Sequence, residues 1–353
     1  MIYLHVPFCR SFCTYCDFYS EIACKGKDEA AIARWADDVC REIEGRRQEI
    51  EATLDLDTLY IGGGTPSVLP LSVLRQILTT LQALRDGQRA GLRPTRGQQY
   101  LHCPSEGHPY TEFTIEVNPE DIVERGAEYV RGLLDLGVNR ISMGVQSLDD
   151  GILRWMNRRH DSTACRHAYS ILTPTNKPDV SIDLITGVPG MTMEILESTV
   201  EEVIGWRPEH ISAYQLSIEE GSALARMIER GEVKELDEEA CRAQYDYLCR
   251  RLAEAGYHHY EISNWALPGH EAIHNSAYWT RHPYVGLGPG AHSLIGNRRS
   301  WNSQKLCGWT SEGEDLTPEQ IHEEEVMLLA RTDKGPIPER DWFIADEIIP
   351  DLL

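Results

Sequence analysis

Three cysteines near the N-terminus have the spacing of a metal-cluster site. Cys9, Cys13 and Cys16 form the pattern C-x3-C-x2-C, so three thiols lie within eight residues of one loop. Thiolates at this spacing can converge on one inorganic core, and a [4Fe–4S] cluster is normally held by four cysteines. Three cysteines leave one iron without a protein ligand, and that iron can bind a small molecule directly. The spacing therefore predicts a [4Fe–4S] cluster with one open iron.

Two other interpretations of these cysteines stay open at this point. Zinc prefers four tetrahedral ligands, so Cys24 or a histidine would have to complete such a site. The three thiols could also be unrelated buried side chains. A disulfide framework is disfavoured, because residues 1–7 lack the basic region and long apolar core of a secretory signal, which favours a reducing, cytoplasmic compartment. The remaining cysteines show no ligand spacing and are interpreted as structural: Cys24, Cys40, Cys103, Cys165, Cys241, Cys249 and Cys307.

The elements that must position the cysteines alternate between strands and helices. Apolar, β-rich runs predict six strands, at residues 2–6, 58–61, 113–117, 140–145, 180–185 and 210–216. Amphipathic stretches predict helices at residues 29–49, 71–84, 124–136, 149–172 and 194–206. This alternation predicts a parallel sheet with right-handed crossovers. Six units are too few for the usual eight-stranded closed barrel, so we expect an α/β fold with a partial (β/α)6 barrel.

Polar and glycine-rich motifs follow the predicted strands. The cysteine loop follows the first strand, and Gly62-Gly63-Gly64-Thr65-Pro66 follows the second. Further motifs close the next three strands, at residues 116–119, 144–147 and 183–189. In folds of this kind ligands bind beyond the C-terminal ends of the strands. Five motifs at one face are more than turn formation requires, so we expect the binding site there.

The alternation stops after about residue 217, which predicts two parts of the chain. Residues 1–217 are expected to form the barrel. Residues 218–353 are expected to form a C-terminal α+β module, which is dense in aromatic residues, histidine and glycine between residues 257 and 301. Residues 85–110 are rich in glycine, glutamine, arginine and proline and predict a surface insertion.

The charge balance limits the partners that we expect. The chain has 56 acidic against 34 basic residues, a formal net charge of −22. Such an acidic surface repels phosphate backbones and anionic membrane surfaces, so nucleic acid is not an expected partner. No run of about 20 apolar residues occurs in the sequence, so we expect no transmembrane segment.

The sequence resembles the radical SAM superfamily, whose cluster motif is C-x3-C-x2-C and whose fold is a partial barrel. The segments Tyr3-Leu4-His5-Val6-Pro7-Phe8-Cys9 and Gly62-Gly63-Gly64-Thr65-Pro66-Ser67 are more specific. They resemble the oxygen-independent coproporphyrinogen III oxidase-like family. This resemblance extends from residue 2 to about residue 300, whereas the insertion at 85–110 and the last fifty residues match poorly.

Two further motifs resemble one branch of that family, the haem chaperones (HemW-like). The decarboxylating oxidases carry a further cysteine two residues after the third, where this chain has Phe18 in Cys16-Asp17-Phe18. The segment His274-Asn275-Ser276-Ala277-Tyr278-Trp279 is similar to the HNxxYW motif of the chaperone branch. The resemblance implies a chaperone that binds a [4Fe–4S] cluster, S-adenosylmethionine (SAM) and haem, and transfers haem to a membrane-associated acceptor.

Two alternatives to a haem chaperone remain at this stage. The first is an enzyme that decarboxylates coproporphyrinogen III by radical SAM chemistry in porphyrin biosynthesis. The missing cysteine at Phe18 argues against it. The second is a zinc-stabilised protein without redox chemistry, which would leave the glycine-rich motif at residues 62–66 without a purpose.

The resemblance also implies which residues contact SAM. The positions that match the family's contacts are Tyr3, Tyr15, Gly63, Gly64, Thr65, Glu116, Gln146, Arg158 and Asp183. Carboxylates can accept hydrogen bonds from hydroxyl and ammonium groups, and arginine can pair with a carboxylate. Structural interpretations also exist, since Glu116 and Asp183 could cap the helices that follow them and Arg158 could lie on a solvated helix face.

A haem site is expected in the C-terminal module. Haem iron accepts histidine as an axial ligand. His274 is the expected ligand because it opens the HNxxYW motif, and Tyr278 and Trp279 are expected to pack against the porphyrin. An isolated histidine more often serves as a hydrogen-bonding group of the core or surface. The sequence has no C-x-x-C-H motif, which excludes covalent c-type attachment.

Overall fold

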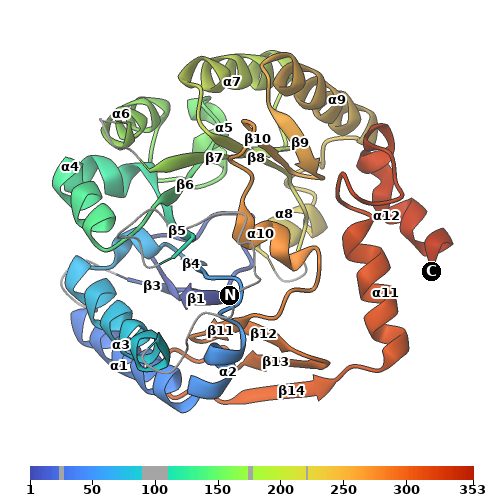
Figure 1. The fold of residues 1–353 in the computed structure, drawn as a ribbon. Coiled ribbons are helices and arrows are strands. Elements are labelled where there is room, and N and C mark those ends of the chain that lie inside the picture. The colour runs from blue at the N-terminus through green and yellow to red at the C-terminus, as the bar shows by residue number, and fades with distance from the viewer. Residues whose placement is uncertain (24–27, 90–109, 174–177, 220–221) are drawn as a thin grey trace.

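The computed structural model describes residues 1–23, 28–89, 110–173, 178–219 and 222–353. Its centre is one curved sheet of nine strands, in the order β11-β1-β4-β5-β6-β7-β8-β10-β9, with helices packed on its outside (Figure 1). Six consecutive strands of the sheet are parallel: β1 (Ile2–Val6), β4 (Thr58–Gly63), β5 (Glu112–Val117), β6 (Arg140–Gln146), β7 (Asp179–Thr186) and β8 (His210–Gln215). The edge strands β11 and β9 are not paired with each other, so the barrel is open. The predicted α/β fold is confirmed.

Helices connect the parallel strands, as the alternation predicted. In the first 217 residues they are α1 (Glu29–Gly45), α2 (Arg47–Ala52), the 3-10 turn η1 (Pro66–Val68), α3 (Leu71–Arg89), α4 (Pro119–Asp135), α5 (Asp150–Trp155), α6 (Ser162–Leu172) and α7 (Met193–Trp206). A short parallel pair, β2 (Phe8–Cys9) and β3 (Glu21–Ile22), frames the cysteine loop.

The parallel strands divide their side chains between two environments. Along β7, Val180, Ile182 and Leu184 are buried in the apolar core beneath the helices, whereas Ser181 and Asp183 face a cavity inside the sheet. The alternation follows from the two-residue period of a strand. Polar residues in the strands therefore line the interior, and apolar residues hold the outer helices.

The stretch at residues 149–172 differs from the single helix that we expected. Helix α5 ends at Trp155, and Asn157 adopts a left-handed conformation with φ of 57°. Helix α6 then begins afresh, because the carboxylate of Asp161 accepts a hydrogen bond from the Ala164 amide at 2.8 Å. This break releases Arg158 from a helix face and lets it reach the cavity.

The predicted insertion lies only partly in the described structure. Helix α3 extends to Arg89, beyond the predicted end at Leu84. The buried Arg85 pairs with Asp57, and its guanidinium lies 4.1 Å from the centre of the Tyr110 ring. Residues 90–109, which hold most of the predicted insertion, lie outside the described residues.

Strands from the C-terminal part extend the sheet at both edges. β11 (Val285–Leu287) pairs parallel with β1, and β10 (Asn264–Ala266) pairs antiparallel with β8 and with β9 (His258–Glu261). The other elements of this part are α8 (Ala223–Glu229), α9 (Glu238–Glu254), α10 (Ile273–Tyr278), β12 (His292–Ile295), β13 (Arg298–Asn302), β14 (Ser311–Asp315), α11 (Pro318–Leu329), η2 (Glu339–Ile344), α12 (Ala345–Ile348) and η3 (Ile349–Leu352). The division at residue 217 stays a prediction about independent units.

Across the described part of the chain, no helix combines the length and the apolar character that a membrane crossing requires.

Candidate functional site

A cavity of about 560 Å³, to which many polar side chains contribute, occupies the inside of the open barrel. At the C-terminal ends of the strands its lining includes the cysteine loop and the glycine-rich turn after β4. At the opposite end it reaches Arg140 and His210, the first residues of β6 and β8, and Asn275 of helix α10. Hence the cavity has a rim, where the strands end, and a base, where α10 lies.

The three cysteines line the rim together. Cys9 is buried, and its Sγ lies 3.4 Å from the Thr65 hydroxyl, whereas Cys13 and Cys16 are half-buried. Burial raises the pKa of the Cys16 thiol to about 11, with smaller contributions from Cys13 and Cys9. Three thiols on one cavity wall fit the ligand set of an iron–sulfur cluster.

The glycine-rich turn lets the cysteine loop lie against the end of β4. The Gly64 amide donates to the Val6 carbonyl at 2.8 Å. A Cβ atom on Gly64 would lie 2.8 Å from the Phe8 carbonyl oxygen and 3.0 Å from the Cys9 Sγ. The neighbouring Gly63 has a φ of 111°, which disfavours a side chain. These two positions need glycine for the cysteine loop to fit.

Two half-buried carboxyl groups lie on the cavity wall below the rim. Glu116 accepts hydrogen bonds from the Tyr60 hydroxyl at 2.8 Å and from the Gly63 amide at 3.1 Å. Asp183 accepts from the Ser142 hydroxyl at 2.7 Å. Burial raises the pKa of Glu116 to about 7 and that of Asp183 to about 6. Their hydrogen bonds hold both groups ready for a cation or for hydroxyl donors.

Arg158 links the rim to the strand ends. Its guanidinium donates to the Asn118 side-chain oxygen at 2.7 Å, to the Gly144 carbonyl at 2.9 Å and to the Cys13 Sγ at 3.4 Å. Burial lowers the pKa of this guanidinium, but interactions with Tyr15 and Cys13 outweigh that effect, so the pKa stays above its ordinary value. Arg158 therefore places a fixed positive charge beside the cysteines.

The structure brings most of the predicted SAM residues to this cavity. Those that line it are Tyr15, Gly63, Gly64, Thr65, Glu116, Gln146, Arg158 and Asp183. Gln146 does so from a left-handed backbone conformation, with φ of 65°. Tyr3 is different, because it is not part of the lining and its hydroxyl bonds to the His5 Nδ1 at 3.1 Å.

The HNxxYW motif lies at the base, where its residues point in different directions. Asn275 lines the cavity, but His274 does not and is fully buried. The His274 Nδ1 lies 2.8 Å from the Thr58 hydroxyl, and its Nε2 lies 3.1 Å from the Tyr278 hydroxyl. Burial lowers the pKa of His274 to about 3, so the ring is neutral. Trp279 ends helix α10 as its C-cap residue.

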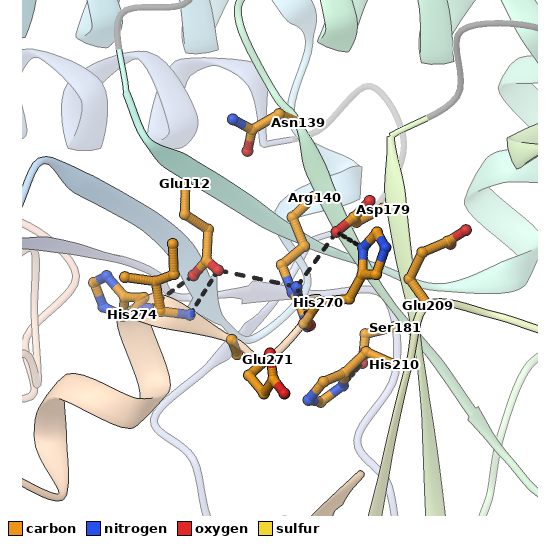
Figure 2. A network of polar contacts seen from close by, with 12 residues as sticks. Glu112, Asn139, Arg140, Asp179, Ser181, Glu209, His210, His270, Glu271 and His274 are labelled. Carbon is orange, nitrogen blue, oxygen red and sulfur yellow. Dashed lines mark hydrogen bonds and ion pairs between the residues drawn. The ribbon is translucent and has the colours of Figure 1, made fainter. Parts of the chain in front are cut away.

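Sequence reasoning missed several polar residues of the cavity. Tyr60, Arg140, Ser181 and His210 all lie inside predicted strands and line the lower wall. Figure 2 shows Arg140 and His210 near the base, where the Ser181 hydroxyl lies 2.8 Å from the His210 Nδ1. Their signal in the sequence is a polar side chain at every second position of an otherwise apolar strand.

Comparisons with known proteins agree with this geometry. The family model of the radical SAM superfamily matches residues 3–203. The haem chaperone HemW of Synechocystis is 34% identical over 337 residues, which cover 92% of this chain and 75% of that protein. The haem chaperone HemW of Lactococcus lactis is 31% identical over 346 residues, 96% of this chain and 83% of that one.

A solved structure has the same fold. Coproporphyrinogen III oxidase (HemN) from Escherichia coli, described as a radical SAM enzyme, superimposes with a TM-score of 0.71 at 21% identity. The superposition covers 99% of this chain and 81% of that one. By the superfamily model, the sequence relatives and the cysteine-rimmed cavity, this chain belongs to the radical SAM superfamily and, within it, to the HemW family.

Proposed function

We propose that this protein is a haem chaperone that binds a [4Fe–4S] cluster, SAM and haem and hands haem to an acceptor protein. The observation that carries the proposal is the position of Cys9, Cys13 and Cys16 on the rim of one cavity, with two half-buried carboxyl groups on the wall below them. The curated relatives named haem chaperones, which match nearly the whole chain, supply the class of activity.

The cavity residues divide into two groups by chemistry. The three cysteines would hold the cluster, which supplies an open iron for the amino and carboxylate groups of SAM. Glu116 and Asp183 would accept hydrogen bonds from SAM hydroxyl and ammonium groups, and Arg158 would pair with its carboxylate. Tyr15, Gly63, Gly64, Thr65 and Gln146 would complete the wall, with Tyr3 supporting it from behind.

Haem binding is assigned to the C-terminal part, residues 218–353, next to a barrel formed by residues 1–217. His274, Tyr278 and Trp279 remain the sequence-based prediction for this site. The acceptor is proposed to be membrane-associated, and the chaperone itself is proposed to work in the cytoplasm.

Coproporphyrinogen III oxidation is the second candidate, because the motifs at residues 3–9 and 62–67 resemble the family that contains this enzyme, and its fold is the same. At 21% identity the superposition describes the fold alone. Phe18, whose exposed fraction is 67%, lines the rim where the resemblance expects a further cysteine in the decarboxylating branch. The missing thiol favours the chaperone.

The test starts from protein whose cluster is reconstituted without oxygen. Haem is titrated and followed by its Soret absorbance, and a second sample is incubated with SAM, a reductant and coproporphyrinogen III. We expect saturable haem binding and no protoporphyrinogen. Repeated turnover of the porphyrinogen without haem binding would overturn the proposal.

A further inference from the structure

Both ring nitrogens of His274 already have partners in this structure. Nδ1 lies 2.8 Å from the hydroxyl of Thr58 in β4, and Nε2 lies 3.1 Å from the Tyr278 hydroxyl. The ring has no exposed surface. An axial haem ligand needs a nitrogen lone pair that faces the iron. In this arrangement His274 offers neither the lone pair nor an approach for a porphyrin.

The backbone that carries His274 is held as firmly as its ring. The Glu112 carboxylate accepts from the Ile273 amide at 2.8 Å and from the His274 amide at 2.9 Å. Arg140 lies between this carboxylate and Asp179, 3.9 Å from the first and 3.8 Å from the second (Figure 2). A carboxylate held by a buried arginine fixes the start of α10, so a swing of His274 toward a ligand would disrupt several bonds at once.

His274 also contacts a residue of the cavity wall. The centres of the His274 and Tyr60 rings are 5.3 Å apart, with 35° between the planes. The Tyr60 hydroxyl donates to Glu116 at 2.8 Å, and the Gly63 amide donates to the other oxygen of that carboxylate at 3.1 Å. One chain of contacts thus runs from His274 through Tyr60 to the carboxyl group below the cysteines.

We propose that His274 is a positioning residue for the SAM end of the cavity, acting through Tyr60 and Glu116, and is not the axial ligand of haem. The proposal rests on SAM binding in the proposed function and reassigns one residue of the HNxxYW motif. Replacing the ring removes the face on which Tyr60 packs, and the Tyr60 hydroxyl then loses its fixed direction toward Glu116.

The experiment measures SAM and haem affinity in the same reconstituted protein. SAM binding is followed by its change in the electron paramagnetic resonance spectrum of the reduced cluster, and haem binding by Soret absorbance. For His274→Ala we expect the Kd of SAM to rise at least tenfold and the Kd of haem to stay within twofold. His322→Ala, an exposed histidine on α11, is the control and should change neither.

Tyr60→Phe tests the route of the effect. It keeps the ring but removes the hydroxyl that bonds to Glu116, so it should also weaken SAM binding. Because both changes act on one chain of contacts, the double variant should bind SAM no more weakly than His274→Ala alone. His274→Gln keeps a planar side-chain group that can pack on Tyr60, together with a donor and an acceptor, and should recover part of the SAM affinity. If the alanine variant does not fold, SAM and haem affinity are measured on His274→Gln instead.

Three results would overturn the inference. A haem Kd raised tenfold at unchanged SAM affinity would make His274 a haem ligand. Equal loss of both affinities, with a lower unfolding midpoint, would make its role merely structural. Additive effects of His274→Ala and Tyr60→Phe would remove the route through Tyr60. Wild-type protein that binds no SAM at all would instead contradict the proposed function.

Discussion

The rim and the base of the cavity differ in how their polar atoms are used. At the rim, Cys13 and Cys16 are half-buried and line the cavity, and the Cys13 Sγ accepts a hydrogen bond from Arg158 at 3.4 Å. At the base, His274 and Glu112 are buried and have partners on each side. Both regions carry motifs that resemble one family, yet the cysteines of the rim line the cavity whereas the His274 ring does not.

This difference separates two roles that a sequence motif can have. A group that binds a cofactor must keep a donor or acceptor atom free and reachable. A group whose bonds are all made within the protein holds other residues in place. The comparison predicts that changes at the rim remove cofactors outright, whereas changes at the base act through neighbouring residues.

The largest expected effect comes from removing one rim thiol. Cys13→Ala should abolish the cluster, because two cysteines cannot replace the three that the loop provides. Iron and acid-labile sulfide are measured after anaerobic reconstitution. Cys307→Ala is the control, because this half-buried cysteine lies far from the motif in the sequence. This variant should keep its full iron content. One zinc and no iron in the wild-type protein would instead support the zinc interpretation.

The next effect comes from the turn that supports the rim. In Gly64→Ala the new Cβ would lie 2.8 Å from the Phe8 carbonyl and 3.0 Å from the Cys9 Sγ. We expect a loss of about 3 kcal/mol in unfolding free energy and a lower iron content. Gly45→Ala at the end of α1, where a Cβ meets nothing within 4 Å, should be neutral or stabilising. If urea unfolding gives the same change in unfolding free energy for both variants, the rim is not tightly packed around Gly64.

A smaller effect should depend on pH through Glu116. Burial raises its pKa in the folded protein to about 7 from an ordinary value near 4.5. Between these values the folded state binds more protons than the unfolded state, so this group lowers stability as pH rises. Glu116→Gln lacks this penalty.

The variant should therefore gain stability relative to wild type between pH 5 and pH 7.5, by about 2 kcal/mol. Urea unfolding of both cluster-free proteins at the two pH values measures the gain. Glu128→Gln is the control, since the Glu128 side chain is 92% exposed, and its difference from wild type should be the same at both pH values. A difference for Glu116→Gln that does not change with pH would contradict the raised pKa.

The smallest predicted effect concerns two adjacent arginines. Arg158→Lys loses the planar group that reaches Asn118, Gly144 and Cys13 together, so SAM should bind about tenfold more weakly, or about 1.4 kcal/mol. Arg159→Lys, whose side chain is 35% exposed and pairs with Glu120, should bind SAM as wild type does. The Kd of SAM for each variant is measured from the spectrum of the reduced cluster. If both variants bind SAM equally weakly, Arg158 has no specific role in SAM binding.

The strands and the rim could be predicted from the sequence because their signals are local. Apolar runs marked the six parallel strands, and short motifs at their ends marked the cavity rim. The helix break at Asn157 was missed, because the amphipathic pattern continues through it, and because the Asn157 side chain donates at 2.7 Å to the carbonyl of Phe12, which is 145 residues away in the sequence. The bonds of His274 could not be foreseen either. Thr58, one of its partners, is 216 residues away in the sequence.

Haem transfer tests the central claim most directly. The cluster-reconstituted protein is loaded with haem, freed of excess haem, and mixed with apomyoglobin, whose Soret band reports the haem that it receives. The account predicts that the protein retains haem on its own and releases it to the acceptor. Failure to retain any haem, with coproporphyrinogen III converted in a parallel sample, would contradict the account and make this protein a decarboxylating enzyme.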